Sequence, residues 1–134
     1  MLREKTATIE TTQEKLFRMC KNISEELTSG KLDKEDYGHF YDLTEEEQEE
    51  WEPSGYDYLE NVYDIKYVVG GDGQYYGSQL MVAGGGPNIY IDTQEMQVQG
   101  YWGSDRVIVH FRDNIGLNDA LEDTMSINHQ FNKC

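Results

Sequence analysis

The sequence predicts an α+β fold, in which a five-stranded antiparallel meander sheet carries an N-terminal and a C-terminal helix packed on one face. Apolar residues recur with the helical period near both ends of the chain. Between residues 62 and 111 the period changes to two, and the connections there are so short that neighbouring strands must be antiparallel. The 134 residues fit one domain, with a helical acidic part at 11–60, a sheet at 62–111 and a C-terminal helix at 114–130.

The first helix begins at Thr11, which forms a capping box with Glu14 three residues later. Gly30 is expected to end it in the left-handed conformation. Its expected apolar stripe consists of Leu16, Cys20, Ile23 and Leu27, widened by Phe17 and Met19. This single apolar face should lie against a sheet or another helix.

A weaker helical pattern follows at 33–53, where Tyr37, Phe40 and Tyr41 are candidates for inward positions. Thr44 and Glu47 predict a second capping box, and Pro53 should close the segment. Period two then predicts strands near 65–69, 75–83, 88–92, 96–102 and 106–111. The last helix should begin near Asp113 or Asn118, with a thin apolar stripe of Leu117, Leu121 and Met125.

The composition limits the partners of the chain. It holds 26 Asp and Glu against 11 Lys and Arg, a formal net charge of −15, which repels nucleic acid and anionic membranes. The N-terminal residues show no secretory signal, and no apolar stretch is long enough to span a bilayer. Only Cys20 and Cys134 are present, so neither a disulfide framework nor a metal spacing is expected, and the cytoplasm is the expected location.

Acidic residues are concentrated in one segment. No Lys or Arg lies between Lys34 and Lys66, a stretch that holds 12 of the 26 acids. Such carboxylates could imitate the phosphates of a nucleic acid and occupy a basic groove, or they could form an ordinary solvated surface. The candidate partner-binding residues are Glu35, Asp36, Asp42, Glu45, Glu46, Glu47, Glu49, Glu50, Glu52, Asp57 and Glu60, together with Tyr90 and Tyr101 on the sheet.

Tyr90 and Tyr101 belong to a cluster that also holds Trp102, Asp105 and Arg106, a composition typical of interface hot spots and also of cross-strand packing. The two tyrosines should alternate away from the apolar face of the sheet.

Other patterns give little support to catalysis or cofactor binding. Gly84, Gly85, Gly86 and Pro87 precede a strand rather than a helix, so we expect a tight connection packed close to another element, not a phosphate loop. His39, His110 and His129 lie in different elements with no metal spacing. His110 beside Asp105 could form an acid/base pair, but no nucleophile elbow accompanies it. We expect no catalytic residue, no metal and no cofactor.

The stretch from Gly77 to Asp105, with GSQLMVAGGGPNIYIDT followed by QVQGYWGSDR, resembles small acidic proteins carried on bacterial mobile elements. The wider group of such proteins includes anti-restriction and anti-CRISPR inhibitors. The resemblance and the charge together imply a non-enzymatic counter-defence inhibitor, a monomer or homodimer that mimics DNA and occupies the basic groove of a host nuclease. The alternatives are a structural, assembly or small regulatory interaction domain of a mobile element, and a small ligand-binding domain or enzyme.

Overall fold

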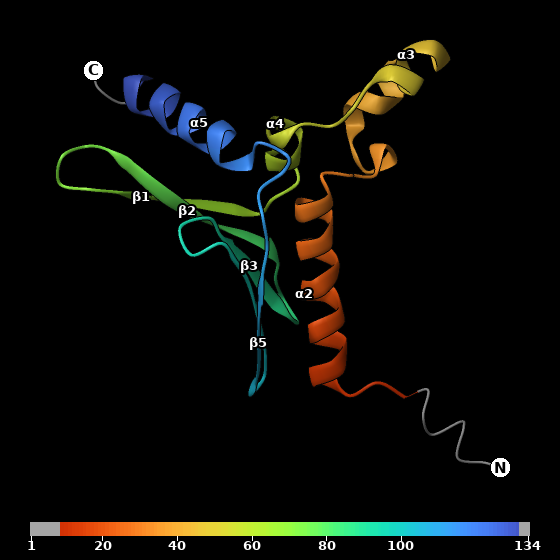
Figure 1. Ribbon diagram of the computed structural model, residues 1–134, viewed down its shortest axis with the longest axis vertical. Coiled ribbons are helices and arrows are strands. Elements are labelled where there is room, and N and C mark those ends of the chain that lie inside the picture. The colour runs from red at the N-terminus through yellow and green to blue at the C-terminus, as the bar shows by residue number, and fades with distance from the viewer. Residues whose placement is uncertain (1–8, 132–134) are drawn as a thin grey trace.

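The computed structural model describes the backbone of residues 9–131 and the side chains of residues 9–126. It consists of a long helix, an irregular helical segment, a sheet and a last helix (Figure 1). The elements in chain order are α2 (Thr12–Ser29), η1 (Lys34–Asp36), η2 (Gly38–Asp42), α3 (Glu45–Glu50), α4 (Gly55–Leu59), β1 (Asp64–Val69), β2 (Tyr75–Ala83), β3 (Asn88–Asp92), β4 (Gln97–Trp102), β5 (Asp105–His110) and α5 (Leu117–Phe131).

The sheet confirms the predicted meander. Its strand order is β1-β2-β3-β4-β5, and each neighbouring pair is antiparallel. One cross-strand row, Ile65, Leu80, Ile91, Val98 and Val109, contributes to the core. Because successive side chains point to opposite faces, the adjacent rows lie on the other side of the sheet.

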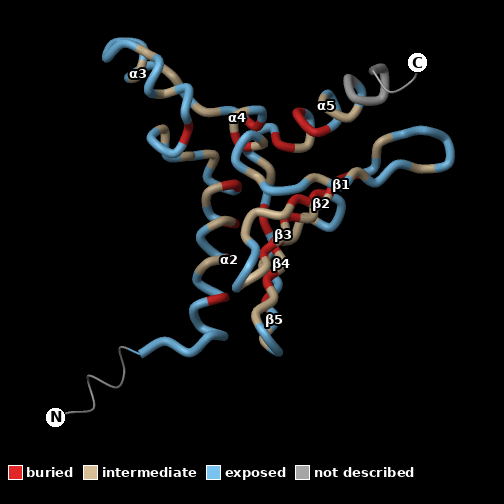
Figure 2. Tube along the Cα trace, turned by 180° about the vertical axis from the view of Figure 1, so that it is seen from behind, coloured by how far each residue is buried: buried red, intermediate tan, exposed pale blue. Residues whose placement is uncertain are grey.

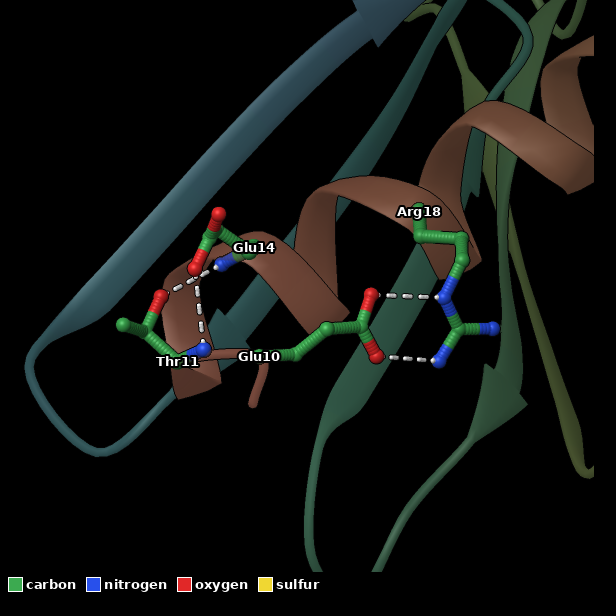
Figure 3. A network of polar contacts seen from close by, with 4 residues as sticks. All are labelled: Glu10, Thr11, Glu14 and Arg18. Atoms are coloured by element: carbon green, nitrogen blue, oxygen red, sulfur yellow. Dashed lines mark hydrogen bonds and ion pairs between the residues drawn. The ribbon is translucent and has the colours of Figure 1, made fainter. Parts of the chain in front are cut away.

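Helix α2 begins where the sequence predicts. The Thr11 amide donates to Glu14 Oε1 at 3.0 Å, and the Glu14 amide donates to Thr11 Oγ1 at 3.1 Å (Figure 3). Arg18 adds a two-pronged ion pair to Glu10, with nitrogen–oxygen distances of 2.9 and 3.0 Å. At the other end, Gly30 adopts the left-handed conformation with φ of 75° and its amide donates to the Glu26 carbonyl.

The buried face of α2 packs on β4 and β5, and Figure 1 shows the helix running alongside β5. Helix and sheet lie close together at Gly100, where a Cβ atom would lie 2.6 Å from Cys20 Sγ and 2.8 Å from Leu16 Cδ1. The sequence prediction was wrong for Phe17, which is 48% exposed. Ser24 occupies the inner face instead, and its hydroxyl donates to the His110 carbonyl at 2.6 Å.

Helix α5 completes the same core with Leu117 and Leu121, which confirms that both terminal helices cover one face. The Asp113 carboxylate caps it by accepting from the amides of Leu117 and Asn118, both at 2.8 Å. The short helix α4, which the sequence prediction did not separate, packs against α5. A Cβ at its Gly55 would lie 2.6 Å from the Gly116 carbonyl oxygen, so only glycine permits this contact.

Two further expectations were wrong. Tyr41 is 65% exposed rather than inward. The glycines 84–86 form an exposed turn, and a Cβ at Gly85 or Gly86 would meet nothing within 4 Å, so the turn is not packed against another element. Buried residues gather instead along the sheet and the facing side of α2 (Figure 2). Within the described residues, no helix has the length and apolar character needed to cross a membrane.

Candidate functional site

The acidic segment forms a lobe at the C-terminal end of α2, which we define as residues 34–52 and call the acidic lobe. It holds nine acids and one lysine, a net charge of 1 − 9 = −8 with histidine neutral. Figure 1 shows its helix α3 directed away from the sheet. All nine of these acids are exposed, and the trace of the lobe is largely coloured as exposed in Figure 2.

Polar and aromatic contacts hold the acidic lobe in shape. The Lys34 ammonium donates to the Gln48 carbonyl at 2.8 Å and to the Glu49 carbonyl at 3.0 Å. A positive charge at the C-terminal carbonyls of a helix is favourable, and this one offsets the acids at that end of α3. The Trp51 ring contacts the rings of Tyr37 and His39 at centroid distances of 6.3 and 5.3 Å. The lobe is therefore an ordered part of the fold.

The inner side of α3 is marked by Gln48, whose amide donates to the Phe40 carbonyl at 2.9 Å. At about 100° per residue, Glu46 and Glu50 lie on the opposite, outward side. Like charges four residues apart destabilise a helix by about 0.2–0.5 kcal/mol per pair. The ion pairs among the described side chains are Arg18–Glu10 and Lys21–Glu25, so no carboxylate of the lobe is paired with a cation there.

Some of the predicted partner-binding acids have structural roles within the fold. Glu47 caps α3, because its Oε1 accepts from the Thr44 amide at 2.9 Å, which confirms the predicted capping box. Asp57 is half-buried, and its Oδ2 accepts from the Ser54 amide at 2.8 Å at the start of α4. Glu60 is exposed at the end of α4. Fewer carboxylates are therefore available to a partner than the set of acids predicted from the sequence.

Tyr90 and Tyr101 lie apart from the lobe, on the sheet face opposite α2. Tyr90 pairs in register with Gln99, and Tyr101 pairs with Asn88 and Arg106. Their rings form an edge contact at 6.1 Å, and the Arg106 guanidinium lies 6.0 Å from the centre of the Tyr101 ring. Both tyrosines alternate away from the apolar face as predicted, so the sequence-predicted residues form two separate surfaces.

A pocket at the root of the acidic lobe was missed by sequence reasoning. This pocket, which we call the Glu26 pocket, is a cavity of about 200 Å³ bordered by Ile23, Glu26, Asp36, Tyr37, Tyr58 and Val82. Loss of solvent raises the pKa of the Glu26 carboxyl, and the charges of Asp36 and Asp33 raise it further. Its members come from α2, the lobe, α4 and β2, and only the position of Glu26 one residue before buried Leu27 gave a local signal.

The two tyrosines of this pocket are more than nine-tenths buried, Tyr37 at 6% and Tyr58 at 9% exposure. Burial, followed by the charge of Glu26, raises the pKa of both phenols well above the ordinary range. In the described part of the chain neither hydroxyl has a hydrogen-bond partner. No side-chain polar atom described there is both sealed from solvent and unpaired, so both hydroxyls are open to solvent, and both residues border the pocket.

Other arrangements offer less. A larger hollow of about 810 Å³ along the second half of α2 is wide and shallow, and the Ser24 hydroxyl on its border is already bonded. Asp105 and His110 begin and end β5, so they form no acid/base pair. Among the described residues, no group of three His, Cys, Asp or Glu side chains could hold a metal ion. Burial raises the pKa of the Cys20 thiol to about 11, which makes it a poor nucleophile.

Comparison of the chain with models of protein families, with curated proteins and with solved structures gave no match.

Proposed function

We propose that this protein is a non-enzymatic binding protein of the cytoplasm, whose acidic lobe occupies a basic nucleic-acid-binding groove of another protein. In the counter-defence setting suggested by its resemblance to mobile-element proteins, the partner is a host nuclease and the lobe acts as a DNA mimic. The observation that carries the proposal is the acidic lobe itself, which has a net charge of −8 and no ion-paired carboxylate among the described side chains.

The energetics of α3 favour this reading over an ordinary solvated surface. Surface helices commonly place opposite charges four residues apart, whereas α3 places Glu45 with Glu49 and Glu46 with Glu50. Its single lysine neighbour is bound to backbone carbonyls and leaves the carboxylates unneutralised. A cationic groove would relieve this repulsion on binding and would speed the encounter by steering the two proteins together.

The experiment is capture of proteins from a host extract on the immobilised full chain at low salt, followed by displacement with double-stranded DNA. Wild-type protein is compared with a lobe variant carrying Glu46→Lys, Glu49→Lys and Glu50→Lys, which spares the capping Glu47. A control variant reverses the exposed Glu25, Glu95 and Glu122. Both variants have the same net charge, −15 + 6 = −9.

We expect wild type and control to retain a protein that DNA releases, and the lobe variant to lose it. Retention by all three proteins, or by wild type in a form that DNA does not displace, would contradict the proposal. Circular dichroism of the three proteins checks that the fold is unchanged.

The open sheet face favours a second candidate, an assembly or regulatory interaction domain. Among the described elements no helix packs on this face, which presents Met81, Tyr90, Tyr101 and Ile108. Aromatic and apolar residues of this kind supply the buried centre of many interfaces. Light scattering over a range of concentrations tests this candidate, because self-association through the face should be abolished by Tyr90→Ser with Tyr101→Ser.

A further inference from the structure

We infer that the Glu26 pocket is a binding site for an alkylguanidinium group, and that it receives an arginine side chain of the partner whose basic groove contacts the acidic lobe. The inference deepens the proposed function, since it rests on that function for the source of the arginine. The chemistry of the pocket itself stands on independent observations, which follow.

The polar groups on the border of the pocket offer several hydrogen-bond acceptors. Glu26 and Asp36 supply carboxylates, and the hydroxyl oxygens of Tyr37 and Tyr58 accept hydrogen bonds through their lone pairs. The Asn61 amide, also on the border, uses its nitrogen to donate to the Asp36 carbonyl at 3.1 Å, so its oxygen remains an acceptor. A ligand with positive charge and several N–H donors therefore matches these groups.

The unpartnered phenols are the decisive feature. Each residue is more than nine-tenths buried, yet its hydroxyl has no hydrogen-bond partner in the described chain and stays open to solvent. Both residues border one cavity beside a half-buried carboxylate that no cation neutralises among the described side chains. A bound cation would satisfy all three groups together.

The shape favours guanidinium over a bulky ligand. Pockets for drug-sized molecules usually measure about 300–1,000 Å³, whereas this one is about 200 Å³, closer to the size of one long side chain. Ile23, Val62 and Val82 provide apolar walls for a methylene stem. Two tyrosine rings beside the acids suit a planar cation, which stacks on aromatic faces and presents five donors.

Position connects the pocket with the lobe. Asp36 and Tyr37 belong both to the pocket and to the first turns of the acidic lobe. A basic groove seated on the lobe therefore brings its arginines to the mouth of the pocket. One inserted arginine would give a fixed anchor to an interface that is otherwise held by long-range charge.

The test is a nuclear magnetic resonance titration of the isotope-labelled full chain with three probes. These are acetyl-Gly-Arg-Gly amide, its citrulline analogue, which has the same shape without the charge, and n-butylguanidinium, which carries no peptide. We expect saturable shifts at the amides of Glu26, Tyr37 and Tyr58 with the arginine peptide, with a dissociation constant on the order of 1 mM for so small a ligand. The citrulline peptide should bind at least about tenfold more weakly.

Substitutions separate the pocket from general attraction to an acidic protein. Glu26→Gln keeps the volume, removes the charge and should weaken the arginine peptide at least about tenfold, whereas Glu25→Gln, on the exposed side of the same helix, should not. Tyr58→Phe removes one hydroxyl and should weaken binding several-fold. Equal binding of the arginine and citrulline peptides, or shifts confined to Glu45–Glu50, would overturn the site.

n-Butylguanidinium should shift the same amides, because it carries the alkylguanidinium group of arginine without the peptide. Binding of the arginine peptide without binding of n-butylguanidinium would place recognition on the peptide backbone and overturn the site. The outcomes also separate this inference from the proposed function. If the pocket binds the arginine peptide saturably but the lobe captures no protein that DNA displaces, the guanidinium site is supported and the proposed partner is refuted. If the lobe captures a partner and Glu26→Gln does not change that capture, the proposed function is supported and the arginine anchor is refuted.

Discussion

The packing of α2 on the sheet depends on the absence of a side chain at Gly100, and Gly100→Ala tests this dependence. The added Cβ would lie 2.6 Å from Cys20 Sγ, 2.8 Å from Leu16 Cδ1 and 3.1 Å from Leu16 Cγ, all shorter than ordinary van der Waals contact. Cys20 and Leu16 are both fully buried, so neither has free space to move into. Helix and strand must therefore separate, or both side chains must leave their preferred rotamers.

Overpacking of this kind costs about 1–3 kcal/mol. Replacing a strand glycine returns about 0.4–1 kcal/mol, because the unfolded chain loses conformational freedom. The expected net loss in the free energy of unfolding is about 1–2 kcal/mol, or on the order of 5 °C in the melting temperature of a domain of this size. Urea denaturation followed by circular dichroism measures it.

Gly86→Ala is the matched control, because a Cβ there meets nothing within 4 Å. It should leave the free energy of unfolding unchanged or raise it by up to about 1 kcal/mol. If Gly100→Ala were as harmless as the control, α2 would not be seated on β4 as described. A partial recovery in the double variant Gly100→Ala with Cys20→Ala would show that the two atoms compete for the same space.

Three further substitutions test the pocket, the lobe and the last helix. Glu26→Gln should stabilise the protein at neutral pH and have little effect below about pH 4. The reason is that a carboxyl whose pKa is raised in the folded state costs stability only as pH rises through that pKa. Urea denaturation at several pH values checks this. Lys34→Met should accelerate amide hydrogen exchange in α3 and leave the sheet unchanged, since two hydrogen bonds from its ammonium hold the end of that helix. Asp113→Ala should cost about 1–2 kcal/mol in unfolding by urea, because it removes the cap of α5; an unchanged midpoint would count against the cap.

Local rules in the sequence were sufficient for most of the fold. The Thr11–Glu14 box, Gly30 and the period-two runs specify backbone hydrogen bonds between near neighbours, so helix α2 and all five strands could be predicted. Helix α4 has only five residues and depends on contact with α5, and its local signal, Ser54 with Asp57, is short. Phe17 lies just outside the arc of α2 that faces the sheet, an orientation that hydrophobicity alone does not fix.

The candidate site was only partly predictable. The excess of carboxylates is visible in composition, but their sorting into exposed groups, caps and pocket members depends on tertiary structure. Glu26 is one glutamate among many in the sequence. It becomes distinctive only in the fold, which brings Tyr37 and Tyr58 to it from other elements and partly buries its carboxyl.

The central claim, that the acidic lobe binds through its charge, is tested most directly by the salt dependence of the captured complex. The dissociation constant of wild type is measured from low to physiological ionic strength, beside that of the control variant Glu25→Lys, Glu95→Lys and Glu122→Lys. Screening should weaken both complexes steeply over this range. A dissociation constant of wild type that stays constant with salt would contradict the claim.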